Sequence, residues 1–126
     1  MAALKVEVRS KSAPSPVGPY SQAVDAGAVY CAGQIGASPS SGKLEEGIVA
    51  QTSRALSNLE AVLAGAGLGL NSIVKTTVFM TDLAEFQSMN EEYSKHFSPP
   101  YPARSTVQVA ALPKSARVEI EAVAVR

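Results

Sequence analysis

The sequence predicts an α+β fold in which a six-stranded mixed sheet carries two helices on one face. Six short stretches alternate apolar and polar side chains or are rich in β-branched residues, which is typical of strands. Two longer stretches repeat apolar residues every three or four positions, the spacing of amphipathic helices. The predicted order is β, β, β, α, β, α, β, β within one domain spanning residues 1–126.

The N-terminal part is predicted to hold three strands. Residues 4–9 alternate apolar and polar side chains, as a half-buried strand does. Residues 12–19 are rich in Pro, Ser and Gly and predict a loop. Residues 20–26 and 28–34 are expected to form a hairpin, because Gly27 supplies a turn between them.

The first helix is predicted between Gly47 and Gly65, where a glycine is a typical helix end. Its apolar face is made by residues at helical spacing, namely Ile48, Thr52, Ala55, Leu56, Leu59, Val62 and Leu63. Residues 73–80 follow and are β-branched and aromatic, so they predict the fourth strand.

The second helix is expected to begin after Thr81 and Asp82, which offer an N-cap, and to end before Pro99. The side chains expected to be buried along it are Leu83, Phe86, Met89, Tyr93 and Phe97. Residues 104–112 and 118–125 predict the last two strands. Because their connection is short, we expect these two strands to form an antiparallel pair.

Both faces of the predicted sheet carry apolar side chains. In the last strand, Val118 and Ile120 share one face, whereas Val123 and Val125 share the other. Two helices can cover only one of these faces, so a second copy of the chain is the economical cover for the other. We therefore expect a homo-oligomer. The alternative is that the loop of residues 12–19 folds over that face.

Composition excludes several classes of function. Lysine plus arginine number 11, as do aspartate plus glutamate, and this balance argues against a nucleic acid or an anionic membrane as the main partner. No apolar run approaches the ~20 residues of a membrane span. Cys31 and His96 are the only residues of their types, so we expect no metal site and no intrachain disulfide. A reducing, cytoplasmic location fits, and a mitochondrial or plastid location stays open.

Arg104 and Glu121 are the residues best suited to chemistry. Arg104 stands at a strand entry, where its planar fork of donors could bind a carboxylate or phosphate, although a surface ion pair is the commoner role. Glu121 has Val123 and Val125 on its own face, which suits a partly desolvated carboxylate for proton transfer; the alternative is a solvent-exposed glutamate. Tyr20 could line a pocket or cover an edge of the core.

Five segments together resemble one known family, in the same order and at the family's spacing. They are Gly18-Pro19-Tyr20-Ser21-Gln22-Ala23, Ala32-Gly33-Gln34-Ile35, Val74-Lys75-Thr76-Thr77-Val78, Pro102-Ala103-Arg104-Ser105, and Leu112-Pro113-Lys114 with Val118-Glu119-Ile120-Glu121-Ala122. The chain is similar to the YjgF/YER057c/UK114 family, also called RidA, over nearly its whole length. Its segments are closest to the enamine/imine deaminase branch.

This resemblance implies a fold like the bacterial type of chorismate mutase, assembled as a homotrimer with a barrel core and with clefts between neighbouring subunits. Members of this branch hydrolyse reactive 2-imino acids, such as 2-iminobutanoate and 2-iminopropanoate, to 2-oxo acids and ammonia. The deaminase itself uses no cofactor. Other family members are described as single-strand ribonucleases or translation inhibitors, and a ligand-binding or chaperone-like trimer without catalysis is a third alternative.

The resemblance also implies roles for individual residues. Arg104 would clamp the substrate carboxylate, and Glu121 would activate the water that attacks the imine carbon. Tyr20 would wall the cleft, and Gly33 would allow a close backbone approach. Asn90 matches a position near the cleft more weakly.

The resemblance further implies that main-chain N–H groups around Thr106 and Val107 would support the bound acid. Thr106 stands where the family often has Cys, and Ala32 stands where it often has Ser. The first departure suggests that no thiol is required there, and the second removes any role for a serine hydroxyl.

Overall fold

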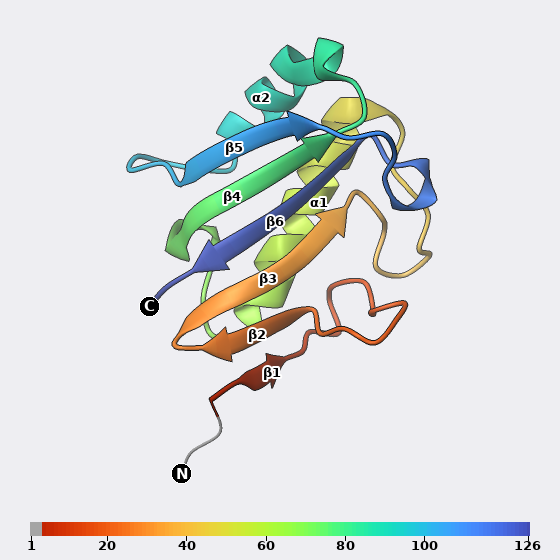
Figure 1. Ribbon diagram of the computed structural model, residues 1–126. Coiled ribbons are helices and arrows are strands. Elements are labelled where there is room, and N and C mark those ends of the chain that lie inside the picture. Colours follow the sequence, from red (N-terminus) through yellow and green to blue (C-terminus); the bar gives the residue numbers. More distant parts are fainter. Residues whose placement is uncertain (1–3) are drawn as a thin grey trace.

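The computed structural model describes residues 4–126 as a six-stranded mixed sheet backed by two helices (Figure 1). The strands are β1 (Val6–Val8), β2 (Ala23–Ala26), β3 (Ala28–Ile35), β4 (Ile73–Met80), β5 (Ala103–Gln108) and β6 (Val118–Ala124), in the spatial order β1-β2-β3-β6-β4-β5. Helices α1 (Gly47–Ala64) and α2 (Phe86–Ser94) lie on the same face of the sheet. The predicted fold class is therefore confirmed.

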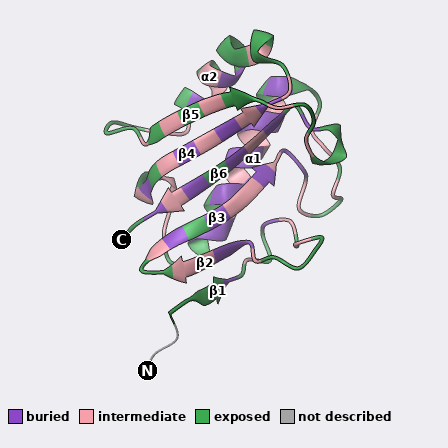
Figure 2. Cartoon of the chain, viewed as in Figure 1, coloured by how far each residue is buried: buried purple, intermediate pink, exposed green. Residues whose placement is uncertain are grey.

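The core lies between the sheet and α1, which packs against β3 and β6. Leu56, Leu59 and Leu63 project from α1 and are completely shielded from water. Burial of each such side chain contributes roughly 1.5–3 kcal/mol. Figure 2 shows the buried residues concentrated where the helix crosses the sheet.

One glycine sets how closely α1 approaches β3. A Cβ at Gly36 would lie 2.5 Å from the Cα of Gln51, so any larger residue would push the helix away from the sheet.

The side-chain amide of Gln51 joins two distant segments. Its Nε2 donates to the carbonyl of Glu45 at 3.1 Å, and its Oε1 accepts from the backbone N–H of Arg117 at 2.8 Å. The beginning of β6 is thereby fixed to α1.

A bulge interrupts β3 near its C-terminal end. Cys31 pairs with Ala122 and Gln34 pairs with Ile120, so the two residues between them on β3 oppose the single residue Glu121 on β6. A bulge of this kind re-aims side chains and is common beside functional sites. The bulge places Ala32 and Gly33 opposite Glu121, one of the two residues that the sequence marked as best suited to chemistry.

The expectation that the last two strands pair is wrong. Strand β4 lies between them, parallel to β5 and antiparallel to β6. The physical reason is the helix between β4 and β5: a helical crossover lets the chain return in the same direction, whereas a short turn would reverse it. Strand β5 is consequently an edge strand.

Several expected boundaries also shift. The strand expected from Tyr20 begins at Ala23, and the one expected to reach Leu112 ends at Gln108. The side chain of Asp82 accepts the N–H of Ala84 at 2.9 Å, as an N-cap should, but it caps a single 3-10 turn (Leu83–Glu85) that precedes α2. Other one-turn 3-10 helices span Leu70–Ser72 and Pro113–Ser115. Leu83 and Phe86 were expected to be buried, yet they are 41% and 36% exposed.

The sheet face opposite the helices is uncovered in the isolated chain (Figure 1). Tyr30 and Val107 on this open face are exposed, and Ala13 of the loop expected as an alternative cover is buried in the hydrophobic core instead. The homo-oligomer stays a prediction. Within residues 4–126, no helix combines the length and the apolar character that crossing a bilayer requires.

Candidate active site

Arg104 lies on the helix side of the edge strand β5, where two aromatic rings of α2 hold it. Its guanidinium carbon is 4.7 Å from the ring centroid of Tyr93 and 5.6 Å from that of Phe86. No ion pair to Arg104 forms among the described residues. The guanidinium is therefore a fixed cation whose charge no side chain within residues 4–126 neutralises.

A hollow of about 380 Å³ opens beside Arg104. Its walls are Asn90, Tyr93, Ser94, Tyr101, Pro102 and Arg104. Asn90 and Arg104 thus line the same hollow, and the family resemblance had implied that both lie near one cleft. A cation, an amide and two phenols around a recess of this size can accept a small carboxylate.

Glu121 lies on the opposite face of the sheet from Arg104. In the register, Arg104 pairs with Thr76, which is buried under the helices, whereas Glu121 pairs with the next residue, Thr77. Successive side chains of a strand point to opposite faces, so Arg104 faces α2 and Glu121 faces the open side. The expectation that Arg104 and Glu121 lie on paired strands is therefore wrong. Within one chain the guanidinium and the carboxylate cannot meet, because they lie on opposite faces of the sheet.

Glu121 is exposed in the isolated chain, so there it is the solvent-exposed glutamate that was the alternative expectation and not a partly desolvated one. The open face around it forms a second hollow of about 330 Å³. The lining residues are Tyr30, Cys31, Lys75, Thr77, Glu121, Ala122 and Val123. Burial raises the pKa of the Cys31 thiol to about 11, so this cysteine is protonated at neutral pH and is no nucleophile. Among residues 4–126, no group of three or more His, Cys, Asp and Glu side chains is arranged to hold a metal ion.

Gly33 faces a second carboxylate that the sequence analysis missed, Glu119. A Cβ at Gly33 would lie 2.9 Å from the carboxyl carbon of Glu119, so only glycine leaves that side chain in place. Burial, and then the negative charge of Glu121, raise the pKa of Glu119. The strand alternation already placed Glu119 and Glu121 on one face, and this shared face was the available signal.

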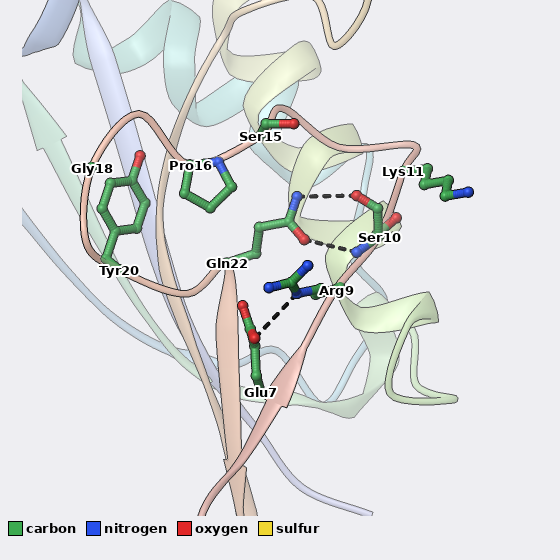
Figure 3. A pocket seen from close by; sticks show the side chains of 9 residues that line it. All are labelled: Glu7, Arg9, Ser10, Lys11, Ser15, Pro16, Gly18, Tyr20 and Gln22. Carbon is green, nitrogen blue, oxygen red and sulfur yellow. Dashed lines mark hydrogen bonds and ion pairs between the residues drawn. The ribbon is translucent and has the colours of Figure 1, made fainter.

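Tyr20 lies on the loop before β2 and is 51% exposed (Figure 3). Its Oη accepts the backbone N–H of Val17 at 3.2 Å, which folds the loop back on itself. The loop and β1 enclose the pocket drawn in Figure 3, a recess of about 590 Å³. Because β1 and β2 form one edge of the sheet and β5 the other, Tyr20 and Arg104 lie near opposite edges of the same chain.

The loop that carries Tyr20 is held by Gln22, another residue that the sequence analysis did not single out. Gln22 is buried, and its Nε2 donates to the carbonyls of Ser10 at 3.1 Å and Pro14 at 2.8 Å. Its Oε1 accepts the N–H of Ser10 at 2.7 Å. Figure 3 shows the paired bonds to Ser10. A buried amide with all these bonds made fixes the loop's path.

Thr106 and Val107 follow Arg104 on β5. The Oγ1 of Thr106 is shielded from water and has no hydrogen-bond partner among residues 4–126. Val107 points to the open face and is 41% exposed. Because β5 is an edge strand, part of its backbone N–H row is unpaired and is available to a ligand or to another chain.

Known proteins that are similar to this chain share its fold. Residues 10–126 match the family described as Endoribonuclease L-PSP. The chain is similar to the 2-iminobutanoate/2-iminopropanoate deaminase of Mus musculus, with 46% identity over 94% of this chain and 90% of that protein. It is also similar to two crystal structures. One is RidA from the Antarctic bacterium Psychrobacter (TM-score 0.93, 43% identity, 96% and 99% of the two chains), and the other is E. coli TdcF with bound serine (TM-score 0.91, 42% identity, 96% and 98%).

Proposed function

This chain belongs to the Endoribonuclease L-PSP family, also known as the YjgF/RidA family, and on that premise we propose that it hydrolyses 2-imino acids. The substrates would be 2-iminobutanoate, 2-iminopropanoate and related compounds, and the products are 2-oxo acids and ammonia. The observation that carries this proposal is Arg104, a fixed cation without a carboxylate partner in the described chain, beside a hollow of small-molecule size.

Arg104 would bind the carboxylate of the 2-imino acid through its planar N–H fork. Charge-assisted, bidentate bonds of this kind are among the strongest hydrogen bonds that proteins make. The related TdcF structure contains bound serine, a ligand that also carries a carboxylate next to a nitrogen-bearing carbon. Asn90 would contact the ligand from the same hollow, and main-chain N–H groups around Thr106 and Val107 would complete the carboxylate site.

Glu121 would supply the proton transfers. In the first half, Glu121 takes a proton from water and gives it to the imine nitrogen, while the water oxygen bonds to the carbon and the C=N π pair becomes a lone pair on nitrogen. In the second half, Glu121 takes the hydroxyl proton and passes it to nitrogen as C=O forms and the C–N bond breaks. Ammonia leaves, and Glu121 ends as it began. No step requires a cofactor.

The complete site would form between copies of the chain. Arg104 and Glu121 occupy opposite faces of one sheet, and Tyr20 lies near the edge remote from Arg104. A second copy that covers the open face can bring Glu121, Gly33 and Tyr20 of one subunit to Arg104 of its neighbour. We therefore propose a homotrimer whose clefts combine residues from two subunits.

The imine-trapping assay tests the proposed activity. A threonine dehydratase generates 2-iminobutanoate, and semicarbazide traps the imine that escapes hydrolysis. We expect the wild-type protein to suppress formation of the semicarbazone, and Arg104→Ala to restore most of it, because loss of a bidentate contact weakens binding about 100-fold. A wild-type protein that leaves semicarbazone formation unchanged would contradict the proposed activity.

A mixed-subunit experiment tests the shared cleft. Arg104→Ala and Glu121→Gln subunits are each inactive in a homo-oligomer of one variant. If the two residues come from different subunits, random mixing in a symmetric ring restores about a quarter of the clefts. If both residues come from one subunit, every cleft keeps one lesion and the mixture stays inactive.

The family description also names an endoribonuclease, and this is the second candidate function. Zero formal net charge provides little attraction for an RNA backbone. Cleavage of a single-stranded RNA by the purified protein, measured beside the imine assay and abolished by Arg104→Ala, would favour the ribonuclease. A ligand-binding trimer without catalysis would bind 2-oxobutanoate but leave semicarbazone formation unchanged.

A further inference from the structure

The two rings beneath Arg104 form a contact that no ion pair accompanies. We call Phe86 and Tyr93 the aromatic seat, because the guanidinium lies over both rings, 5.6 Å and 4.7 Å from their centroids. From their helical spacing, both residues were expected to pack in the core. Phe86 is too exposed for that role alone, and both rings meet the one cation that lines the candidate site.

Tyr93 is itself fixed from below. Its Oη lies 2.7 Å from Oγ1 of Thr76, a buried contact to strand β4, which lies next to the edge strand β5. Its ring packs on Phe97 with the centroids 4.7 Å apart. The chain of contacts therefore runs from the sheet core through Tyr93 to Arg104, and it leaves the ring little freedom to move.

Unlike a carboxylate partner, the aromatic seat does not occupy the hydrogen-bond donors of the Arg104 guanidinium. A carboxylate would occupy the N–H fork of Arg104 and neutralise its charge, whereas a ring attracts the cation through its π-electrons and leaves the charge in place. The N–H groups at the edge remain able to donate to a ligand. Lysine cannot replace arginine here, because an ammonium has neither a flat face nor a fork.

We propose that Phe86 and Tyr93 are positioning residues that hold Arg104 by its face so that its edge can bind the substrate carboxylate. This inference rests on the proposed function for its ligand, but the contact between ring and guanidinium can be measured without turnover. We expect the ring of Tyr93 to determine the affinity for the substrate carboxylate. We expect the hydrogen bond between its hydroxyl and Thr76 to contribute to the stability of the fold.

The first measurement is the NMR chemical shift of the Nε–H of Arg104 in the assembled protein. Ring currents from the seat shift this resonance upfield. We expect Tyr93→Leu to move it toward the value of a solvent-exposed arginine, and Phe86→Leu to move it less, because that ring is farther away. Phe86 is partly exposed, so its variant should fold even if Tyr93→Leu does not.

The second measurement is the affinity for 2-oxobutanoate, the expected product, by calorimetry well below the melting temperature of each variant. Loss of a cation–π contact predicts about five- to thirty-fold weaker binding in Tyr93→Leu. Tyr93→Phe keeps the ring, so we expect affinity within about twofold of wild type but a lower melting temperature, since Thr76 loses its buried partner. Phe97→Leu is the matched control: it removes a ring that touches Tyr93 but not Arg104, and should leave affinity and chemical shift unchanged.

The outcomes separate the two proposals. An unchanged Nε–H shift in Tyr93→Leu and Phe86→Leu, or unchanged affinity despite a changed shift, would overturn the positioning role. So would a loss of affinity in Phe97→Leu or Tyr93→Phe as large as in Tyr93→Leu. A wild-type protein that binds 2-oxobutanoate but leaves semicarbazone formation unchanged contradicts the deaminase, while the same variants still decide the role of the seat. A wild-type protein that does not bind 2-oxobutanoate overturns the positioning role.

Discussion

The two faces of the sheet differ in what covers them and in the charge they carry. On the helix side, apolar side chains fill the core, and the cation Arg104 is held at the sheet edge by two aromatic rings. On the open side lie the two carboxylates Glu119 and Glu121 together with Lys75, and no helix covers them. The candidate anion site and the candidate proton-transfer site are thus separated by one position in the register of β4, because Arg104 pairs with Thr76 and Glu121 with Thr77.

This difference suggests a division of labour. The covered face has little freedom to rearrange, so it suits the positioning of a substrate charge. The open face supplies carboxylates where a partner chain and a substrate would meet.

The largest effect is expected on the open face, from Glu121→Gln. The amide keeps the size of the side chain but cannot take a proton from water. Turnover of 2-iminobutanoate should fall about 10²- to 10⁴-fold, the usual contribution of general acid–base catalysis. Binding of 2-oxobutanoate, measured by calorimetry, should change little, because the covered face holds the carboxylate. Loss of both properties would mean that Glu121 has a structural role.

A core substitution tests the covered face. Leu59 is completely buried between α1 and the sheet, so Leu59→Ala should lower the free energy of unfolding by about 2–5 kcal/mol through lost burial and a cavity. Urea denaturation followed by circular dichroism measures this.

The matched change on the open face is Val123→Ala. Val123 is only partly buried in the isolated chain, so its direct effect on the chain should be smaller. If a second copy covers this face, Val123→Ala will instead weaken assembly, which analytical ultracentrifugation detects. A variant that assembles like wild type and also matches the stability loss of Leu59→Ala would contradict the contrast between the faces.

The smallest effect is a pH-dependent one at Glu119. Its pKa is raised by burial and by Glu121, so the folded chain holds this proton more tightly than the unfolded chain. The resulting stability is present below the unfolded pKa and is lost as the pH rises through the folded pKa. Glu119→Gln should therefore raise the melting temperature relative to wild type at about pH 8, and the difference should disappear near about pH 3.5. A constant difference at both pH values would show that packing, not titration, is responsible.

Much of the fold could be predicted because its signals are local. The apolar repeat of α1 and the alternation in β6 each lie within one short segment, and both elements formed where they were expected. Asp82 was found as a cap for the same reason. The expected burial of Leu83 and Phe86 was wrong, because the chain makes a 3-10 turn before α2 and presents these residues at its margin.

The candidate site was harder to predict. Arg104 and Glu121 were chosen from residue type and flanking sequence, and their roles stay predictions. Their supposed adjacency failed because two strands separated by a short connection need not pair. Glu119 and Gln22 were missed. The position of the Glu119 side chain depends on Gly33, which lies in the bulge of β3 across the sheet. Gln22 holds the preceding loop through hydrogen bonds that the sequence does not reveal.

The class of fold, the type of nearly every element and the charged residues available for chemistry all follow from local sequence, because periodicity, turns and residue type are properties of neighbouring positions. The insertion of β4 between β5 and β6, the bulge opposite Glu121 and the face that each side chain occupies became apparent only in the folded chain. Those features depend on pairing between distant segments. A change of one residue in that pairing would move every side chain of a strand to the other face.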